Sequence, residues 1–274
     1  MLRSVSDLEA FRIGASDGAI GSVKDFYFDD EAWVIRYVVV DTGGWLGGRE
    51  VLISPFSIGT PDWDEQILPV TITKEQVKHS PIVDTDKPVS RQHEAGYLGY
   101  YGYPYYWGGT GLWGEGAYPG AMLSGVAFPS DAAYTKVQAA NDRAALAKEE
   151  DQRAHDDPHL RSCNAVKGNH IHAMDGDIGH VQGFLLDERT WAIRYIIVNT
   201  SNWWVGHQVL VAPEWIDEVS WAHSKVTTCL NRQQIKDAPV YDAEGQLSRV
   251  NEEGIYRHYG RPGYWLDDNE SAAA

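Results

Sequence analysis

The 274-residue sequence predicts a mainly β protein: two tandem small β-barrels joined by a Gly/aromatic-rich linker and a charged helix. Residues 2–107 align on residues 160–265 without a gap, at a constant offset of 158 and with 38 identities in 106 positions. Each copy has short apolar segments about every ten residues, which is typical of a closed or nearly closed barrel. We therefore expect barrel domains at 1–108 and 159–266, a linker and helix at 109–158, and a disordered tail at 267–274.

The first copy shows which segments form its strands. Asp17-Gly18 between apolar segments predicts a hairpin, because both central residues of a type I′ turn need a positive φ. Strands are expected at 20–28, 34–41, 49–54 and 67–71, with a turn at 29–31. Thr73 and Gln76 have the spacing of a helix capping box, and Asn231 and Gln234 repeat it.

Composition excludes several classes of protein. Hydrophobic residues make up 43% of the chain, and 39 acidic against 23 basic residues give a net charge of -16. Such acidity argues against binding to nucleic acid or to anionic lipid. Cys163 and Cys229 are too few and too far apart for a disulfide framework or a metal pair. The start lacks the apolar core of a signal peptide, and no apolar run approaches the length of a membrane span, so we expect a cytoplasmic location.

The repeated segments carry a family resemblance. The run DGAIGSVKDF at 17–26, followed by Asp29 and WVIRYVVV at 33–40, resembles the PRC-barrel family. That family is named for the cytoplasmic domain of the photosynthetic reaction centre H subunit, whose membrane helix this sequence lacks. The second copy is similar at 175–181 and 191–198, and the layout resembles that of uncharacterised bacterial proteins with two such domains. The resemblance implies a six-stranded barrel for assembly and contact, without shared catalytic residues. It also implies roles in stress response or in electron-transfer assemblies.

Three types of residue recur at the start of the same strand. Asp29, Trp33 and Arg36 return as Asp187, Trp191 and Arg194. We expect a hairpin to bring each acid to its arginine as a structural ion pair, and each tryptophan to be largely buried. A site built on these acids is the alternative interpretation. Asp17 and Asp175 are likewise interpreted as turn residues.

No motif of established chemistry appears. His170 and His172 could share a face of a strand and chelate a metal, yet the first copy has Arg12 and Gly14 there. The sequence has no nucleophile elbow, P-loop or dinucleotide fingerprint. We therefore expect no catalytic, cofactor-binding or metal-binding residues, and no cofactor.

The region between the copies is rich in glycine and aromatic residues. Residues 97–107 are interpreted as an aromatic strap packed on the first barrel, with a mobile segment as the alternative, and residues 108–120 as a mobile linker. We expect a Gly/Ser segment to replace 108–120 without unfolding either barrel. The candidate contacts to a partner are Tyr103, Tyr105, Trp113 and Tyr118. Residues 131–151 favour a helix, either a solvated spacer or a partner-docking element.

These observations predict a non-enzymatic adaptor or assembly module. Two related barrels would present two related faces to a protein partner and could bind it with avidity, and a homo-oligomer is compatible with this. The alternative is a sensor or binding protein for a small ligand, with its site between the barrels. A third hypothesis is a hydrolase or redox enzyme with an unrecognised site.

Overall fold

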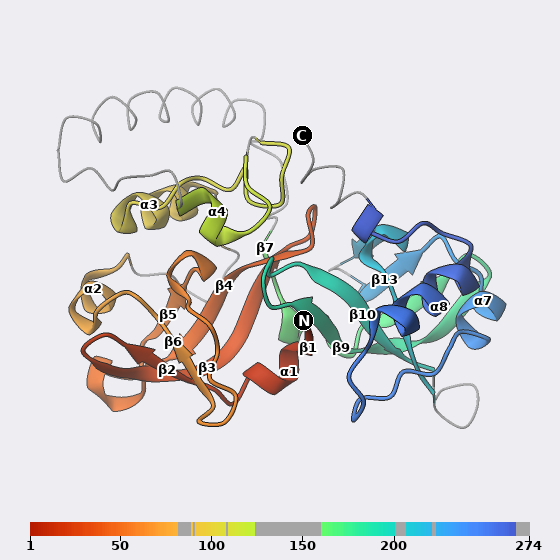
Figure 1. Ribbon diagram of the computed structural model, residues 1–274, viewed down its shortest axis with the longest axis horizontal. Coiled ribbons are helices and arrows are strands. Elements are labelled where there is room, and N and C mark those ends of the chain that lie inside the picture. The colour runs from red at the N-terminus through yellow and green to blue at the C-terminus, as the bar shows by residue number, and fades with distance from the viewer. Residues whose placement is uncertain are drawn as a thin grey trace. The chain divides into compact units, whose positions relative to one another are not determined.

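The computed structural model describes residues 1–81, 89, 91–107, 109–123, 160–200, 207–220 and 223–266. These residues form a mainly β structure with two sheets and short helices, as the sequence predicts (Figure 1). The expected helix at 131–151 and the expected tail at 267–274 lie outside the described residues. The chain divides into two compact units: unit 2 comprises Leu8–Arg161 and Arg189–Trp191, and unit 1 comprises Met1–Asp7, Ser162–Glu188 and Ala192–Ala274.

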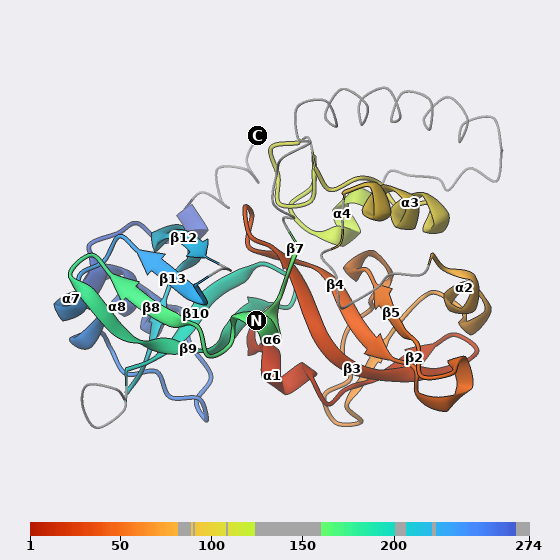
Figure 2. The same cartoon turned by 180° about the vertical axis from the view of Figure 1, so that it is seen from behind.

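Unit 2 is built on a sheet with the strand order β5-β4-β3-β2-β6, and β7 also pairs with β3. Figure 2 shows β2 to β5 side by side. Neighbouring strands are antiparallel except β2 and β6, which are parallel. The strands are β2 (Arg12–Ala15), β3 (Gly18–Asp29), β4 (Val34–Asp41), β5 (Glu50–Ile53), β6 (Ile67–Pro69) and β7 (Leu160–Ser162). The helices are α1 (Val5–Leu8), which the unit boundary crosses, α2 (Lys74–His79), α3 (Arg91–Tyr101) and α4 (Pro119–Leu123), with 3-10 turns at Gly43–Leu46 and Pro55–Ser57.

Unit 1 repeats this plan with the order β11-β10-β9-β8-β13-β12, and β1 pairs with β9. Its strands are β1 (Leu2–Ser4), β8 (His170–Ala173), β9 (Gly176–Asp187), β10 (Ile193–Asn199), β11 (Gln208–Val211), β12 (Ile216–Ser220) and β13 (Lys225–Thr228). Its helices are α6 (Cys163–Val166), α7 (Arg232–Lys236) and α8 (Arg249–Tyr259), with a 3-10 turn at Pro213–Trp215. Corresponding strands thus follow the same order in both sheets. The counterpart of β12 at 58–62 pairs only through the isolated bridges Ile58–Val70 and Asp62–Ile67. Among the described strands neither order returns to its first strand, so barrel closure stays a prediction.

The β4 strand forms the centre of the unit 2 core. All its residues except Asp41 are buried, so both faces of the strand are covered. The phenol of Tyr97, on α3, donates to the carbonyl of Leu52 at 2.9 Å and accepts from the amide of Ser54 at 3.1 Å. The aromatic strap expected at 97–107 therefore begins as the end of a helix. Helix α3 contains Gly96 and Gly99, and because glycine has a low helix propensity the sequence did not predict a helix here.

The hairpin tips after β3 and β9 place a tryptophan at the same position. Trp33 and Trp191 are 8% and 5% exposed, which confirms that both are largely buried. Both have a positive φ, 54° and 59°, which is costly for a bulky side chain. The Trp33 ring stacks on Phe28 at 5.1 Å between centroids. Packing of the ring thus offsets local backbone strain.

The first hairpin forms as predicted, but its turn is shifted by one residue. Ala15 pairs with Gly18, so the turn is Ser16-Asp17, and only Gly18 has a positive φ, of 135°. The expected type I′ turn at Asp17-Gly18 is therefore wrong. The Asp17 carboxylate instead accepts from the amide of Lys74 at 2.8 Å, at the start of α2.

Two capping boxes confirm the helices predicted from Thr73 and Asn231. Each side chain accepts from the backbone amide three residues on, and the Gln76 or Gln234 side chain accepts from the capping residue's amide. In the second copy Asp175 accepts from the Arg232 amide at 2.7 Å, as Asp17 does from Lys74. The acids that precede glycine therefore fix helix starts.

A repeated glycine permits close backbone approach beside the long hairpin. A Cβ on Gly21 would lie 2.0 Å from the carbonyl oxygen of Asp41, and a Cβ on Gly179 equally close to that of Asn199. We expect Gly21→Ala to lower the free energy of unfolding by about 1–3 kcal/mol, since backbone must move. Gly44→Ala is the control, because its Cβ would meet nothing within 4 Å. Equal stability of the two variants in urea denaturation would contradict the close approach.

Candidate functional site

The β3–β4 hairpin brings Asp29 to Arg36, as predicted. The Arg36 Nη2 donates to Asp29 Oδ2 at 3.1 Å, and the side chains are only 2% and 7% exposed. The other carboxylate oxygen accepts from the amides of Glu31 and Ala32 in the turn. In the second copy Arg194 lies 3.9 Å from Asp187. The first pair is the closer and more deeply buried of the two, and its carboxylate also fixes the hairpin turn.

The Arg36 guanidinium lies against two aromatic rings. Its carbon is 3.9 Å from the centroid of Tyr106 and 4.8 Å from that of Trp113. Its Nη1 donates to the carbonyl of Leu112 at 2.7 Å. Cation–π attraction, one carboxylate and one carbonyl together compensate for burying this charge. The arginine thereby ties β4 to residues that follow α3 in the chain.

Trp113 is the largest side chain that is fully buried in unit 2. Its indole nitrogen donates to the carbonyl of Thr190 at 2.7 Å, and its ring meets Phe56 edge-on at 5.0 Å. Backbone bridges from Gly111 to Gly114 and from Trp113 to Gly116 order the same stretch. Trp113 therefore belongs to the core, which corrects its expected role as a contact residue. The described residues of 108–120 are likewise part of unit 2 and not a mobile linker.

The other three candidate contacts differ in exposure. Tyr103 is half-buried and packs on Tyr101, with 5.4 Å between ring centroids. Tyr105 is half-buried and stacks on Trp107 at 4.6 Å. Tyr118 is 37% exposed, and the Arg189 guanidinium lies 5.6 Å from its ring centroid. We define the aromatic face as Tyr105, Trp107 and Tyr118, the partly exposed rings that flank Trp113 in the chain.

A buried carboxylate in each copy accepts hydrogen bonds from two phenols. Glu94, on α3, is 2% exposed and accepts from Tyr37 at 3.2 Å and from Tyr106. Burial, and then the Glu94 charge, hold the pKa of Tyr37 well above its usual value. The phenol therefore stays protonated and keeps donating at neutral pH.

The second copy repeats this group, which the sequence analysis missed. Glu252 accepts from Tyr195 at 3.0 Å and from Tyr264 at 2.8 Å. The offset of 158 relates every member to its counterpart in the first copy. A repeated acid among repeated tyrosines was the available signal. Since each carboxylate fastens a helix to a central strand, the group has a structural function.

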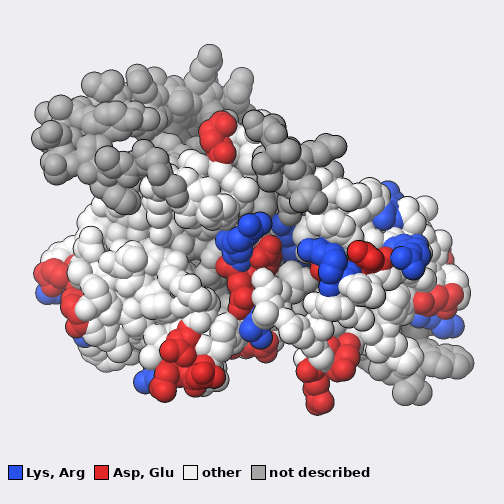
Figure 3. Space-filling view, in the orientation of Figure 1, with Lys and Arg blue, Asp and Glu red and all other residues white. Residues whose placement is uncertain are grey.

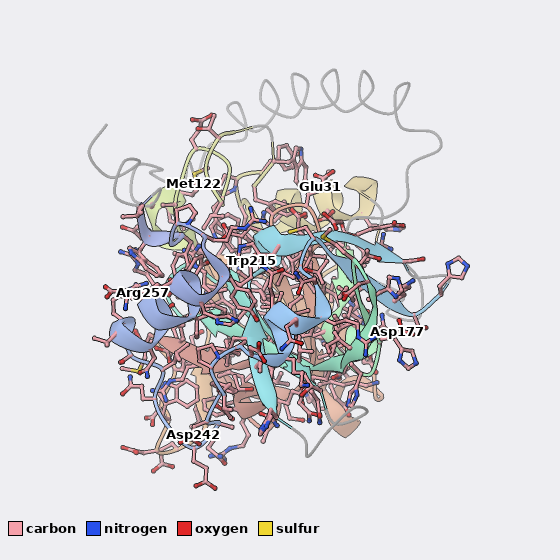
Figure 4. The ribbon with its side chains drawn as sticks, turned by 90° about the vertical axis from the view of Figure 1, so that its right-hand side faces the viewer. Glu31, Met122, Asp177, Trp215, Asp242 and Arg257 are labelled. Atoms are coloured by element: carbon pink, nitrogen blue, oxygen red, sulfur yellow. The ribbon has the colours of Figure 1, made fainter. Side chains whose placement is uncertain are left out.

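Among the described residues, the histidines of unit 1 belong to no group of three or more potential metal ligands. His172 Nδ1 lies 2.7 Å from Asp177 Oδ1, and this hydrogen bond is the main cause that lowers the pKa of the Asp177 carboxyl. Figure 4 shows Asp177 at the edge of the molecule, whereas Trp215 lies among packed side chains. Within the described parts of the chain no three His, Cys, Asp or Glu side chains are placed to hold a metal ion. His155 and His159 lie outside those parts.

Two adjoining grooves open on unit 1. They have volumes of about 340 and 280 Å³ and share Tyr241, Gly245, Gln246 and Leu247. The larger groove has an apolar side that includes Leu210, Val240 and Val250. Acidic Asp242 lines it as well and projects at the lower edge of the view in Figure 4. The grooves were not foreseen from the sequence, because they depend on how residues 239–247 pass over the start of α8.

Comparisons with known proteins match the first copy. Residues 3–77 match the model of the PRC-barrel domain family. An uncharacterized protein of Deinococcus radiodurans is 34% identical over 93 residues, which cover 30% of this chain and 33% of that protein. The match thus spans about a third of the relative. None of the described helices has the length and apolar character needed to cross a membrane.

Proposed function

We propose that this chain, in which residues 3–77 carry a PRC-barrel domain, is a non-enzymatic adaptor or assembly module that binds a protein partner. The observation that carries the proposal is the aromatic face, whose partly exposed rings lie close in the chain to the buried Trp113. Trp113 is fully buried, whereas Tyr118 a few residues later is 37% exposed. Tyr105 stacks on Trp107, and the Trp107 ring meets the buried Tyr106 at 4.9 Å between centroids, so these two rings are held by packing before any partner arrives.

Such preorganisation favours protein contact. Tyrosine and tryptophan bury a large area while losing few rotatable bonds, and they dominate the energetics of many interfaces. Rings already fixed on a folded unit lose still less entropy on binding. Figure 3 shows few Lys, Arg, Asp and Glu side chains on the left-hand part of unit 2.

The proposal predicts a selective loss of partner binding. The full-length Tyr105→Ala/Tyr118→Ala variant should recover about tenfold less partner after crosslinking in the native cell, because two interface rings are lost. Tyr100→Ala is the matched control: Tyr100 is 41% exposed and lies on α3, outside the aromatic face. Equal recovery by the wild type and both variants, at unchanged melting temperature, would contradict the proposal.

A small-ligand binding protein is the second candidate. The two adjoining grooves of unit 1 favour it, because together they reach the size range of ligand sites. Saturable binding of a small molecule, lost on filling the groove with Gly254→Leu, would support this function over the adaptor. Gly254 lines the groove, and its Cβ would meet nothing within 4 Å.

A further inference from the structure

The first strand of the chain pairs with the second repeat. In β1, Leu2 pairs with Asp187 and Ser4 with Leu185, antiparallel to β9. The Arg3 guanidinium donates to Glu188 at 3.1 Å, and the Glu188 amide donates to the Met1 carbonyl at 3.0 Å. By sequence β1 opens the first repeat, yet it is part of unit 1.

The corresponding strand at the start of the second repeat pairs with the first repeat. Leu160-Arg161-Ser162 repeats Leu2-Arg3-Ser4, and its strand, β7, pairs with β3 of the first repeat. Arg161 donates to Asp30 at 2.7 Å, and Asp30 corresponds to Glu188 at the offset of 158. The two repeats thus exchange their first strands reciprocally, each through an arginine–carboxylate pair.

We propose that a second copy of this chain can bind through the same exchange, its Met1–Asp7 segment pairing with β9 and donating Arg3 to Glu188. An exchanged dimer makes every contact of the monomer and needs no new surface, which is the usual basis of domain swapping. The exchanged dimer is favoured over the monomer when the chain concentration approaches the effective concentration of the β1 strand within its own chain. The proposal does not depend on the aromatic face.

The structure places the hinge of this exchange in α1. The boundary between the units falls between Asp7 and Leu8, inside that helix. Val5 and Leu8 are 0% and 1% exposed, so the side chains at both ends of the helix are buried. All three β1 residues are only half-buried, and the Arg3 side chain is 33% exposed. A short, half-exposed strand next to a hinge can open without unfolding the sheet that receives it.

Single-cysteine chains test the exchange. Leu2 and Asp187 are direct partners, and antiparallel partners lie about 4.5–5.5 Å apart between Cα atoms, within disulfide range. Full-length Leu2→Cys and Asp187→Cys chains, both with Cys163→Ala and Cys229→Ser, are mixed over a range of concentrations and oxidised. We expect a covalent heterodimer whose yield rises with concentration to several times that of a control pair. The control joins Leu2→Cys to Gln182→Cys, an exposed position of β9 that β1 does not meet.

The double variant Leu2→Cys/Asp187→Cys in one chain checks the geometry. We expect it to close its own disulfide at low concentration. If it closes while the mixed chains yield no more heterodimer than the control pair, the exchange between copies is wrong. If it fails to close in a folded chain, the pairing of β1 with β9 is wrong, and the proposal falls with it.

Discussion

Trp113→Ala is expected to lower the free energy of unfolding by about 3–5 kcal/mol, the usual cost of removing a large buried aromatic side chain. The residue is 0% exposed and contacts both Phe56 and the Arg36 guanidinium. Removal would also leave the Thr190 carbonyl without its indole donor. Urea denaturation followed by circular dichroism measures the change.

Tyr118→Ala is the control for this prediction. It removes a partly exposed ring five residues away, and surface substitutions usually change stability by within about 0.5 kcal/mol. A loss below about 1 kcal/mol for Trp113→Ala would mean that the indole does not pack as described. The original expectation of a freely replaceable 108–120 segment would then be restored.

Arg36→Ala is expected to be comparably destabilising, by about 3–5 kcal/mol, because it leaves a buried carboxylate without its partner. Asp29 is 5% exposed, and its remaining partners are the turn amides of Glu31 and Ala32. The Leu112 carbonyl would also lose a donor. The double variant Asp29→Asn/Arg36→Met should recover part of the loss, since it removes both charges and keeps the bulk of the arginine.

Arg194→Ala offers a matched comparison from the second copy. Its guanidinium is 3.9 Å from the Asp187 carboxylate, against 3.1 Å for the first pair. We expect Arg194→Ala to cost less stability than Arg36→Ala. Removing Arg36 leaves the Asp29 carboxylate, which belongs to the closer and more deeply buried pair, without its charged partner. A larger loss for Arg194→Ala than for Arg36→Ala would contradict the assigned roles.

The sequence predicted those parts of the fold that depend on local patterns. An apolar segment after the turn at 29–31 located β4, and capping boxes at Thr73 and Asn231 located α2 and α7. The internal repeat related the strand orders of the two sheets. The acid–arginine pairs followed from hairpin geometry, because a tight turn brings the end of one strand beside the start of the next.

Long-range packing could not be predicted in the same way. Trp113 lies among glycines, a composition typical of a linker, yet its burial against Phe56 and Arg36, together with local backbone bridges, orders that stretch. Helix α3 contains Gly96 and Gly99 and is stabilised by tertiary hydrogen bonds of Glu94 and Tyr97. Tertiary contacts override local propensity in both segments.

Hydrogen exchange of residues 103–118 in the full-length chain, alone and with the captured partner, tests the central claim most directly. The account predicts slow exchange at the Gly111 and Trp113 amides in the free chain, because each donates to a backbone carbonyl at 2.7–2.8 Å. It also predicts added protection around Tyr105 and Tyr118 when the partner binds. Rapid exchange throughout 103–118, unchanged by the partner, would contradict both the anchored segment and its use as a contact surface.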